Sequence, residues 1–303
     1  MIDAEQLGRA LPMADAIDAL ETAFRGPLPD APLRSHVETG AGTLLLMPAT
    51  GDAGVGVKLV TLTPRNEGRG LPFIHAVYVL FDGQTQAPRA VLDGAALTAL
   101  RTGAVSGLAT RYLASPDAGT LVVFGAGVQA RAHVEAMRAV RPVERVRVVS
   151  RSSARAEALA AELRADGLDA GVGGPDAVGD ADLICTCTTS PEPVFEGRLL
   201  RPGAHVNAVG AYTPETRELD DEAIRRARVV VETREVAMAE AGDVLIPLRA
   251  GVVGAEHVVA DLAELVGGAP VRRGRDDVTV FVSVGVAFED LVVAAAAIGR
   301  IAP

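Results

Sequence analysis

Cysteine and basic residues are both scarce in this chain of 303 residues. Its two cysteines exclude a disulfide scaffold and favour a reducing compartment. Lys and Arg number 29 against 39 Asp and Glu, and the formal net charge of -10 argues against a broad nucleic-acid-binding face. The longest apolar run, Leu291 to Gly299, is too short to span a bilayer, and acids stand at the N-terminus where a signal peptide carries basic residues. We therefore expect a soluble cytoplasmic protein with neither membrane nor nucleic acid among its partners.

Lysine is the scarcest charged residue, because Lys58 is the only one and every other basic residue counted is an arginine. Arg is planar and permanently charged, whereas Lys carries a compact ammonium whose pKa can fall on burial. A lysine that remains in such a chain can mark a position where Arg does not serve, and Lys is a common proton-transfer residue. The alternative is that Lys58 has no function and is retained by chance on a solvent-exposed face.

Apolar residues make up 49% of the chain, enough for a substantial core, and the length fits one large or two ordinary domains. The first third predicts an α+β unit. Apolar spacing predicts a helix over 3–25, ended by a group of prolines, and later another helix over 94–113. Between them lie strand-like runs at 42–48, 55–63, 74–81 and 87–92, the last two joined by a turn at Asp82-Gly83. These runs predict an antiparallel sheet.

After Ser115-Pro116, short buried strands alternate with helices. This alternation predicts a parallel, doubly wound sheet, so that the fold class is α/β: a Rossmann-type domain beside the α+β unit. The expected strands are 119–124, 145–149, 183–186, 205–209, 229–232 and 279–284, with helices over 129–140, 153–166 and 286–298.

A glycine turn follows the first strand of this second part. Gly125, Gly127 and Ala130 form G-x-G-x-x-A between a strand and a helix. The first Gly makes the tight turn, the second lets the backbone approach a pyrophosphate, and the small third residue lets helix and strand pack closely. The phosphates would lie at the helix N-terminus, where N–H groups attract anions. With both flanks in place, the motif predicts a dinucleotide site; the alternative is a tight turn without a ligand.

The next strand ends in Ser150-Arg151-Ser152, with no carboxylate at its tip. Asp or Glu there would bind a free ribose 2′-hydroxyl, whereas a guanidinium with hydroxyls suits a 2′-phosphate. The sequence therefore favours NADP(H), with NAD(H) possible if Arg151 is an ordinary surface residue.

No metal site is expected. Cys185 and Cys187 share a face if both lie on a strand, but no histidine cluster accompanies them, so buried packing is the better interpretation. The five histidines are scattered and are expected to be structural. Thr188, Thr189 and Ser190 follow the predicted strand at its carboxyl end, where such folds bind ligands.

Several ordered motifs resemble the ornithine cyclodeaminase/mu-crystallin family. They are Lys58 in G-V-K, the turn at Asp82-Gly83, R-T-G-A at 101–104, G-A-G-V-Q-A at 125–130, NAVGAYTPETRELD and VFVSVGVAFED. The resemblance covers nearly the whole chain. It implies a substrate-binding and dimerisation domain formed by 1–114 with 285–303, a Rossmann domain over 115–284, and a homodimer formed through the antiparallel sheet.

The resemblance also assigns roles. Arg34 and Arg101 match arginines that hold a substrate carboxylate, Lys58 matches the lysine at the reacting carbon, and Thr102 matches a contact near the cofactor. Two guanidiniums can grip a carboxylate, and their charge should lower the pKa of a nearby ammonium, so that it exchanges protons with a substrate nitrogen. Met47 is a further expected substrate contact, and Leu46, Val60 and Leu62 are specificity candidates that fit the core equally well. The expected cofactor contacts are Thr102, Gly125, Ala126, Gly127, Val128, Gln129, Ser150, Arg151, Ser152, Cys187, Thr188, Val209, Gly210 and Ser283.

One departure from the family pattern bears on the reaction. Where the deaminating lyases of the family carry an aspartate, this chain has Tyr212, a wall residue or a proton donor. We therefore expect an NAD(P)H-dependent reductase of a cyclic α-imino acid, of the pyrroline- or piperideine-2-carboxylate type. The alternatives are an ornithine or lysine cyclodeaminase using catalytic NAD⁺, an alanine-dehydrogenase-like enzyme, and a non-catalytic binding protein.

Overall fold

The structure is a computed structural model that describes residues 1–301, with only the backbone described at Glu67. The chain divides into two compact units: residues 1–104 together with the chain from Val286 onward, and Val105–Gly285. Helix α3, Gly94–Leu113, begins in the first unit and ends in the second.

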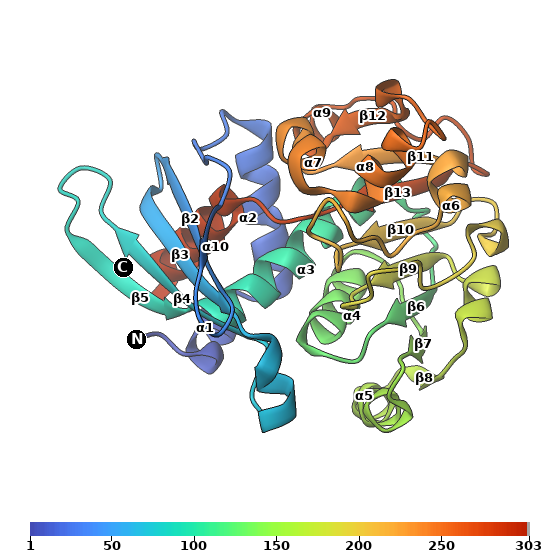
Figure 1. The fold of residues 1–303 in the computed structure, drawn as a ribbon, viewed down its shortest axis with the longest axis horizontal. Coiled ribbons are helices and arrows are strands. Elements are labelled where there is room, and N and C mark those ends of the chain that lie inside the picture. The colour runs from blue at the N-terminus through green and yellow to red at the C-terminus, as the bar shows by residue number, and fades with distance from the viewer. Residues whose placement is uncertain (302–303) are drawn as a thin grey trace. The chain divides into compact units, whose positions relative to one another are not determined.

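The first unit contains a five-stranded antiparallel sheet in the order β1-β2-β3-β4-β5 (Figure 1). Strict alternation of buried and partly exposed residues along the central strands shows that one face is packed and the other is not. Its strands are β1 (Ser35–Glu38), β2 (Thr43–Gly51), β3 (Gly54–Leu62), β4 (Ile74–Phe81) and β5 (Pro88–Asp93).

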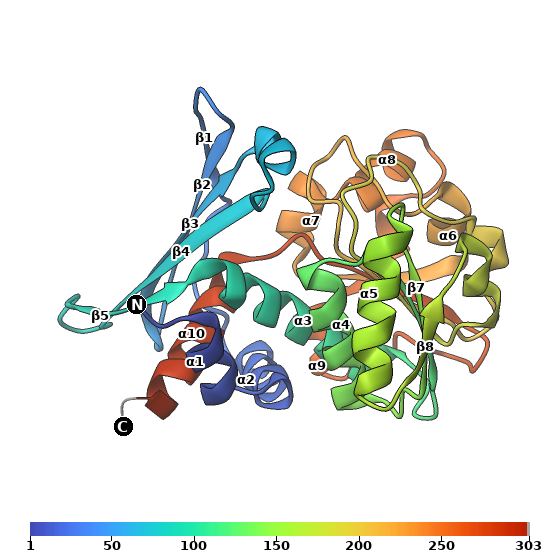
Figure 2. The same cartoon turned by 90° about the horizontal axis from the view of Figure 1, so that it is seen from below.

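Helices α1 (Ala4–Ala10), α2 (Met13–Arg25) and α10 (Ala287–Ile301) lie on one side of this sheet (Figure 2). Phe24 of α2 meets Phe288 of α10 edge to face, with ring centroids 5.2 Å apart. The single helix predicted over 3–25 is wrong. Leu11 is extended and Pro12 caps α2, because a residue before proline is disfavoured in the helical region and proline has no N–H for a continuing helix.

The second unit contains an eight-stranded parallel sheet in the order β12-β11-β13-β10-β9-β6-β7-β8. The predicted α/β class, with a parallel sheet and a separate antiparallel sheet, is confirmed. Its strands are β6 (Thr120–Phe124), β7 (Arg145–Val149), β8 (Asp169–Val172), β9 (Leu183–Thr186), β10 (His205–Ala208), β11 (Ala227–Val231), β12 (Val258–Asp261) and β13 (Val278–Val282). Its helices are α4 (Val128–Val140), α5 (Ser153–Ala165), α6 (Asp221–Arg226), α7 (Arg234–Glu240), α8 (Gly242–Arg249) and α9 (Leu262–Val266).

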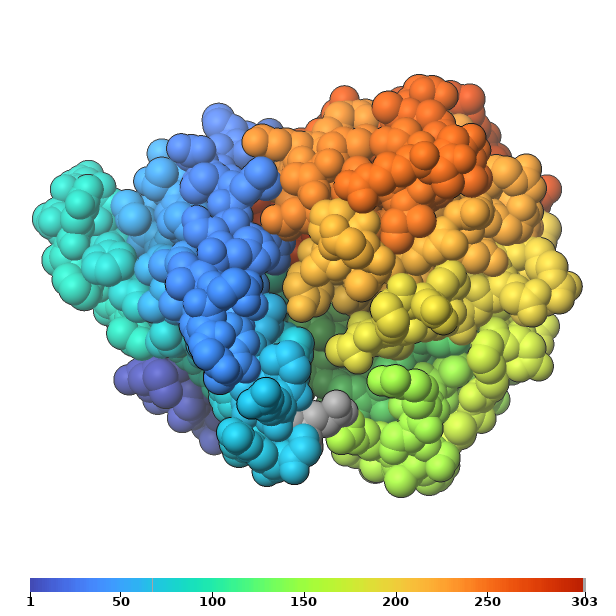
Figure 3. Space-filling model, viewed as in Figure 1, coloured from blue at the N-terminus to red at the C-terminus, as the bar shows by residue number. Residues whose placement is uncertain are grey.

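Strand order reverses between β6 and β9, since the chain proceeds from β6 to β7 and β8 on one side and then returns to β9 on the other. At such a switch point the loops after neighbouring strands diverge and leave a crevice for a ligand. The segments that follow β9 and β10, yellow in the space-filling view, lie on the visible face of the second unit (Figure 3). Among residues 1–301, no helix is long and apolar enough to cross a membrane.

Candidate active site

Lys58 lies in the middle of the packed face of the first unit's sheet. It stands on β3 opposite Met47 of β2 and Tyr78 of β4, so these three side chains form a row across three strands. The Lys58 side chain is only 2% exposed. Chance survival on a solvated face, the alternative that the sequence left open, is therefore wrong.

Four charged side chains meet over this row. The Lys58 Nζ donates to Asp290 Oδ2 at 2.7 Å, and Arg101 Nε lies 3.3 Å from Asp290 Oδ1. Arg101 also donates through Nη1 to Glu289 Oε2 at 3.0 Å. Arg101 comes from α3, whereas both carboxylates stand in the first turn of α10, where the helix dipole favours negative charge. Neither Glu289 nor Asp290 was expected from the sequence.

The pKa of Lys58 is lowered to about 8. Burial is the largest cause, and the positive charges of Arg101 and, less strongly, Arg34 act in the same direction. Asp290 opposes them by its charge and its hydrogen bond. This pKa is thus lowered first by burial, and the two arginines expected from the sequence contribute to the same fall. Near neutral pH, Lys58 is an ammonium close to its own pKa, as a general acid should be.

The Tyr78 hydroxyl is buried and has no hydrogen-bond partner among the described residues. It lies over Gly56, where an added Cβ would come within 1.9 Å of the hydroxyl oxygen. Burial and the nearby charge of Asp290 raise the pKa of Tyr78, so this group stays protonated. The sequence reasoning missed it, although the alternation of β4 against β3 could have paired it with Lys58.

The other residues expected in the substrate site do not all lie on the sheet face that carries Lys58. Met47 and Val60 share the face of Lys58 and are buried, whereas Leu46 projects to the opposite face of the sheet. Arg34 is half-buried just before β1, and Thr102 is buried on α3.

The glycine turn of the second unit has the geometry that a dinucleotide requires. Gly125 has φ 103°, and an added Cβ would lie 2.5 Å from the carbonyl oxygen of Cys187. Only glycine therefore fits where β6 passes the segment after β9. Gly127 is the N-cap of α4, and an added Cβ there meets nothing within 4 Å. This open space above a helix N-terminus fits a pyrophosphate, and Val128, at 65% exposure, borders it.

Glu218 fixes the loops that follow β9 and β10. It is fully buried and accepts hydrogen bonds from Thr188 N at 2.8 Å, Thr188 Oγ1 at 2.6 Å and Gly210 N at 2.7 Å. Asp243 in turn accepts from the backbone of Glu218 and Leu219. Two expected cofactor contacts, Thr188 and Gly210, are therefore held together by a carboxylate that the sequence reasoning overlooked.

Glu232 plays a similar part after β11 and β13. Its carboxylate accepts from Ser283 Oγ at 2.6 Å and from the backbone of Val284 at 2.9 Å and Gly285 at 2.8 Å. The hydroxyl of Ser283, an expected cofactor contact, is thus engaged within the protein.

At the tip of β7 the side chain of Arg151 is exposed, beside two half-buried serines. Ser152 caps α5, and Ser150 accepts a hydrogen bond from Ser152 N. Of the remaining expected contacts, Ala126, Gln129 and Val209 follow the carboxyl ends of β6 and β10, and Tyr212 stands half-buried in the loop after β10.

The two cysteines do not share a strand face. Cys185 is buried within β9, whereas Cys187 follows the end of that strand and is half-buried, because β9 ends at Thr186. Burial raises the pKa of both thiols, so neither is an activated thiolate.

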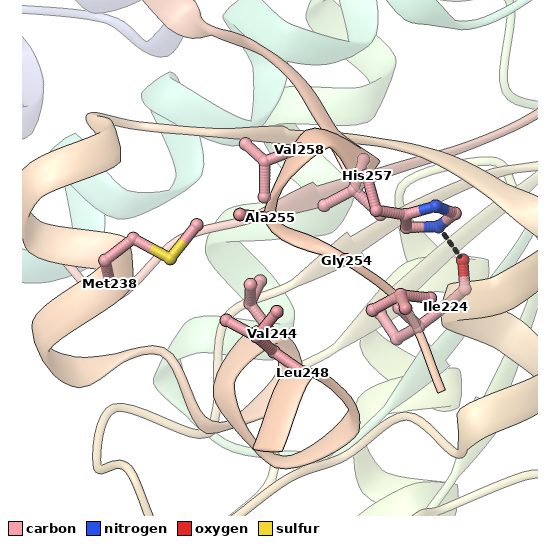
Figure 4. A pocket seen from close by; sticks show the side chains of 10 residues that line it. Ile224, Met238, Val244, Leu248, Gly254, Ala255, His257 and Val258 are labelled. Carbon is pink, nitrogen blue, oxygen red and sulfur yellow. Dashed lines mark hydrogen bonds between the residues drawn. The ribbon is translucent and has the colours of Figure 1, made fainter. Parts of the chain in front are cut away.

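A separate small pocket in the second unit is apolar. Its lining includes Met238, Val244, Leu248 and Val258, and the Nε2 of His257 donates to the carbonyl of Ile224 at 2.6 Å (Figure 4). With its imidazole engaged and no charged side chain, this pocket offers no acid–base chemistry.

Comparisons with known proteins show the family of the chain. The model of the ornithine cyclodeaminase/mu-crystallin family matches residues 1–301, and the chain belongs to this family. A Delta(1)-pyrroline-2-carboxylate reductase of Bacillus cereus is 40% identical over 285 residues, covering 90% of this chain and 84% of the relative.

Solved structures match over almost the whole chain. The Thermococcus litoralis Delta(1)-pyrroline-2-carboxylate reductase, in complex with NADH and L-proline, superposes with a TM-score of 0.93 at 35% identity and covers 99% of this chain and 96% of its own. An archaeal alanine dehydrogenase dimer with bound NAD gives 0.92 at 31% identity, covering 99% and 94%. The family predicted from the sequence motifs is therefore confirmed.

Proposed function

We propose that this protein is an NAD(P)H-dependent reductase of a cyclic α-imino acid of the pyrroline-2-carboxylate type. The observation that carries the proposal is the buried Lys58 ammonium, tuned to a pKa of about 8 between Arg101 and Asp290. The class of reaction, reduction of a C=N bond, agrees with the curated relative at 40% identity, so the sequence-based choice of the reductase branch is confirmed.

Three charged residues of the first unit then have a role. Arg34 and Arg101 bind the substrate carboxylate, since guanidinium groups match its two oxygens. Lys58 donates a proton to the imine nitrogen, which makes the carbon a better electrophile. When bound, the reduced nicotinamide supplies the hydride for that carbon. The imine, the reduced cofactor and one proton become the cyclic amine and the oxidised cofactor, and Lys58 regains its proton from water.

The alternative reactions are distinguishable by what they consume. A cyclodeaminase would release ammonia from ornithine without net oxidation or reduction of the cofactor, and Tyr212 stands where that reaction's aspartate is expected. An alanine-dehydrogenase-like enzyme would need free ammonia together with a 2-oxo acid. The similarity to the archaeal alanine dehydrogenase dimer supports this second candidate. The test is cofactor oxidation with Delta(1)-pyrroline-2-carboxylate, with pyruvate plus ammonia, and with ornithine in parallel. Turnover with the cyclic imine alone is expected, and its absence would refute the proposal.

The cofactor is a nicotinamide dinucleotide, since relatives in this family bind NADH or NAD. Our further proposal is a preference for NADP(H), supported by the exposed Arg151 and the neighbouring serine hydroxyls at the tip of β7. A ratio of kcat/KM for NADPH over NADH above one is the expected result.

A homodimer formed through the first unit's sheet is likewise part of the proposal. One face of that sheet is covered by α10, and the other carries apolar side chains that stay partly exposed in the single chain. They include Leu44, Leu46, Val57, Leu59, Val77 and Val79. A second copy would bury this face, and sedimentation equilibrium should give twice the chain mass of 31.2 kDa. Cytoplasmic location stays a prediction from the sequence.

A further inference from the structure

Asp290 lies between two buried cations, and each of its two carboxylate oxygens meets a different one. Oδ2 accepts from Lys58 Nζ at 2.7 Å, and Oδ1 lies 3.3 Å from Arg101 Nε. The Asp290 side chain is 0% exposed. A bond to a rigid helix turn, with no water to compete, fixes the direction of the lysine side chain.

The charged and titratable groups near Lys58 come from several elements, whereas β2 contributes the uncharged Met47. Arg101 comes from α3, Asp290 from α10, Tyr78 from β4 and Arg34 from the segment before β1; Glu289 is bound to Arg101. Tyr78 is neutral, so Asp290 supplies the negative charge in direct contact with the lysine. Without that charge, burial and two arginines would act on Lys58 together, and all three favour the neutral amine.

We propose that Asp290 is a positioning residue for imine reduction: it orients the Lys58 ammonium and keeps it protonated until the imine nitrogen takes the proton. The inference rests on the proposed function and deepens it. An ammonium has three N–H donors, and the bond to Asp290 uses one of them. Arg101 is oriented by the same carboxylate, so the proton donor and the carboxylate-binding arginine are aligned by one side chain.

The test separates charge from geometry with two substitutions. Asp290→Asn keeps the shape and removes the charge, whereas Asp290→Glu keeps the charge and displaces it by one methylene. For D290N we expect the alkaline limb of the kcat–pH profile to move to lower pH. A shift of one pH unit lowers kcat tenfold at pH values above the limb. For D290E we expect the limb to stay in place and kcat to fall several-fold at every pH.

Because Lys58 is the only lysine in the chain, its ionisation can be observed without any turnover. Incorporation of lysine labelled with ¹³C at Cε gives one resonance, and its shift against pH reports the pKa of Lys58 in the full-length protein. We expect this pKa near 8 in the parent and lower in D290N. Glu289→Gln is the matched control, since Glu289 stands beside Asp290 on α10 but bonds to Arg101 instead of Lys58.

The results decide the matter in either direction. An unchanged lysine titration in folded D290N, or a shift in E289Q as large as that in D290N, would overturn the inference. If D290N does not fold, D290E decides: parental kcat there would contradict the positioning role. An inactive parent protein whose lysine titration still responds to D290N would refute the proposed reaction and leave the link between Asp290 and Lys58 standing.

Discussion

Gly125 and Gly127 have different physical reasons to be glycine, and replacing each with alanine should separate stability from cofactor binding. At Gly125 the backbone has φ 103°, and the new Cβ would lie 2.5 Å from the Cys187 carbonyl oxygen. The conformation alone costs an L-residue about 1–3 kcal/mol. The contact must also displace Cys187, whose N–H donates to Phe124 at 2.8 Å.

We therefore expect Gly125→Ala to lower the free energy of unfolding by about 2–4 kcal/mol, from that backbone cost and a contact cost of about 1 kcal/mol. The melting temperature should fall by roughly 5–15 °C, taking about 2–4 °C per kcal/mol for a unit of this size. Gly127→Ala should melt within about 2 °C of the parent, because its Cβ meets nothing within 4 Å and its φ of -101° suits any residue.

Cofactor affinity should distinguish the two variants in the opposite way from stability, with the larger effect in Gly127→Ala. In Gly127→Ala the methyl group occupies space that we assign to the pyrophosphate, so the Kd for NADPH should rise by about tenfold or more, equivalent to 1.4 kcal/mol. Thermal unfolding by circular dichroism and an NADPH fluorescence titration measure both quantities. Parental NADPH affinity in G127A would refute the dinucleotide site at this turn, and a parental melting temperature in G125A would refute the backbone argument.

Three further predictions follow from single side chains. Lys58→Arg keeps the positive charge but replaces a group with a pKa of about 8 by a guanidinium that does not release its proton. The kcat should therefore fall about 10²–10⁴-fold while the Kd for NADPH is unchanged. A parental kcat in stopped-flow assays would exclude Lys58 as the proton donor. Arg151→Ala should raise the KM for NADPH roughly 10- to 100-fold and leave that for NADH within about twofold, with Arg138→Ala at the far end of α4 as control. Burial and the nearby Glu218 raise the pKa of Asp243 from 3.8 to about 7. Between these pH values the folded state holds a proton on Asp243 that the unfolded state has lost, so the free energy of unfolding falls as the pH rises from 3.8 to about 7. Asp243→Asn, whose amide oxygen can accept the same backbone bonds, should gain stability over the parent by up to about 4 kcal/mol between these pH values; a pH-independent difference in urea unfolding would contradict this sign.

Sequence reasoning succeeded where one local pattern decides a structure. Ile74–Phe81, Gly94–Leu113, Arg145–Val149 and Leu183–Thr186 have the predicted bounds, since the local run of residues sets each of them apart from its neighbours. It failed for β1, β8 and β12, which are four-residue strands, each at the edge of its sheet and none of them fully buried. Such strands exist because a neighbour pairs with them, and that neighbour is distant in the sequence.

The sequence alone predicted the α/β class, which the structure confirms, from the alternation of strands and helices. It also drew attention to the glycine turn and to Lys58, whose proposed roles stay predictions, because glycine geometry and the choice between Lys and Arg are local chemical facts. Tertiary structure alone decided the surroundings of that lysine. Asp290 lies 232 positions away in sequence and reaches Lys58 only because α10 returns to pack on the first unit's sheet. A buried charge needs an oppositely charged partner, and the fold can supply one from a distant part of the chain. Periodicity along the sequence does not predict such a long-range ion pair.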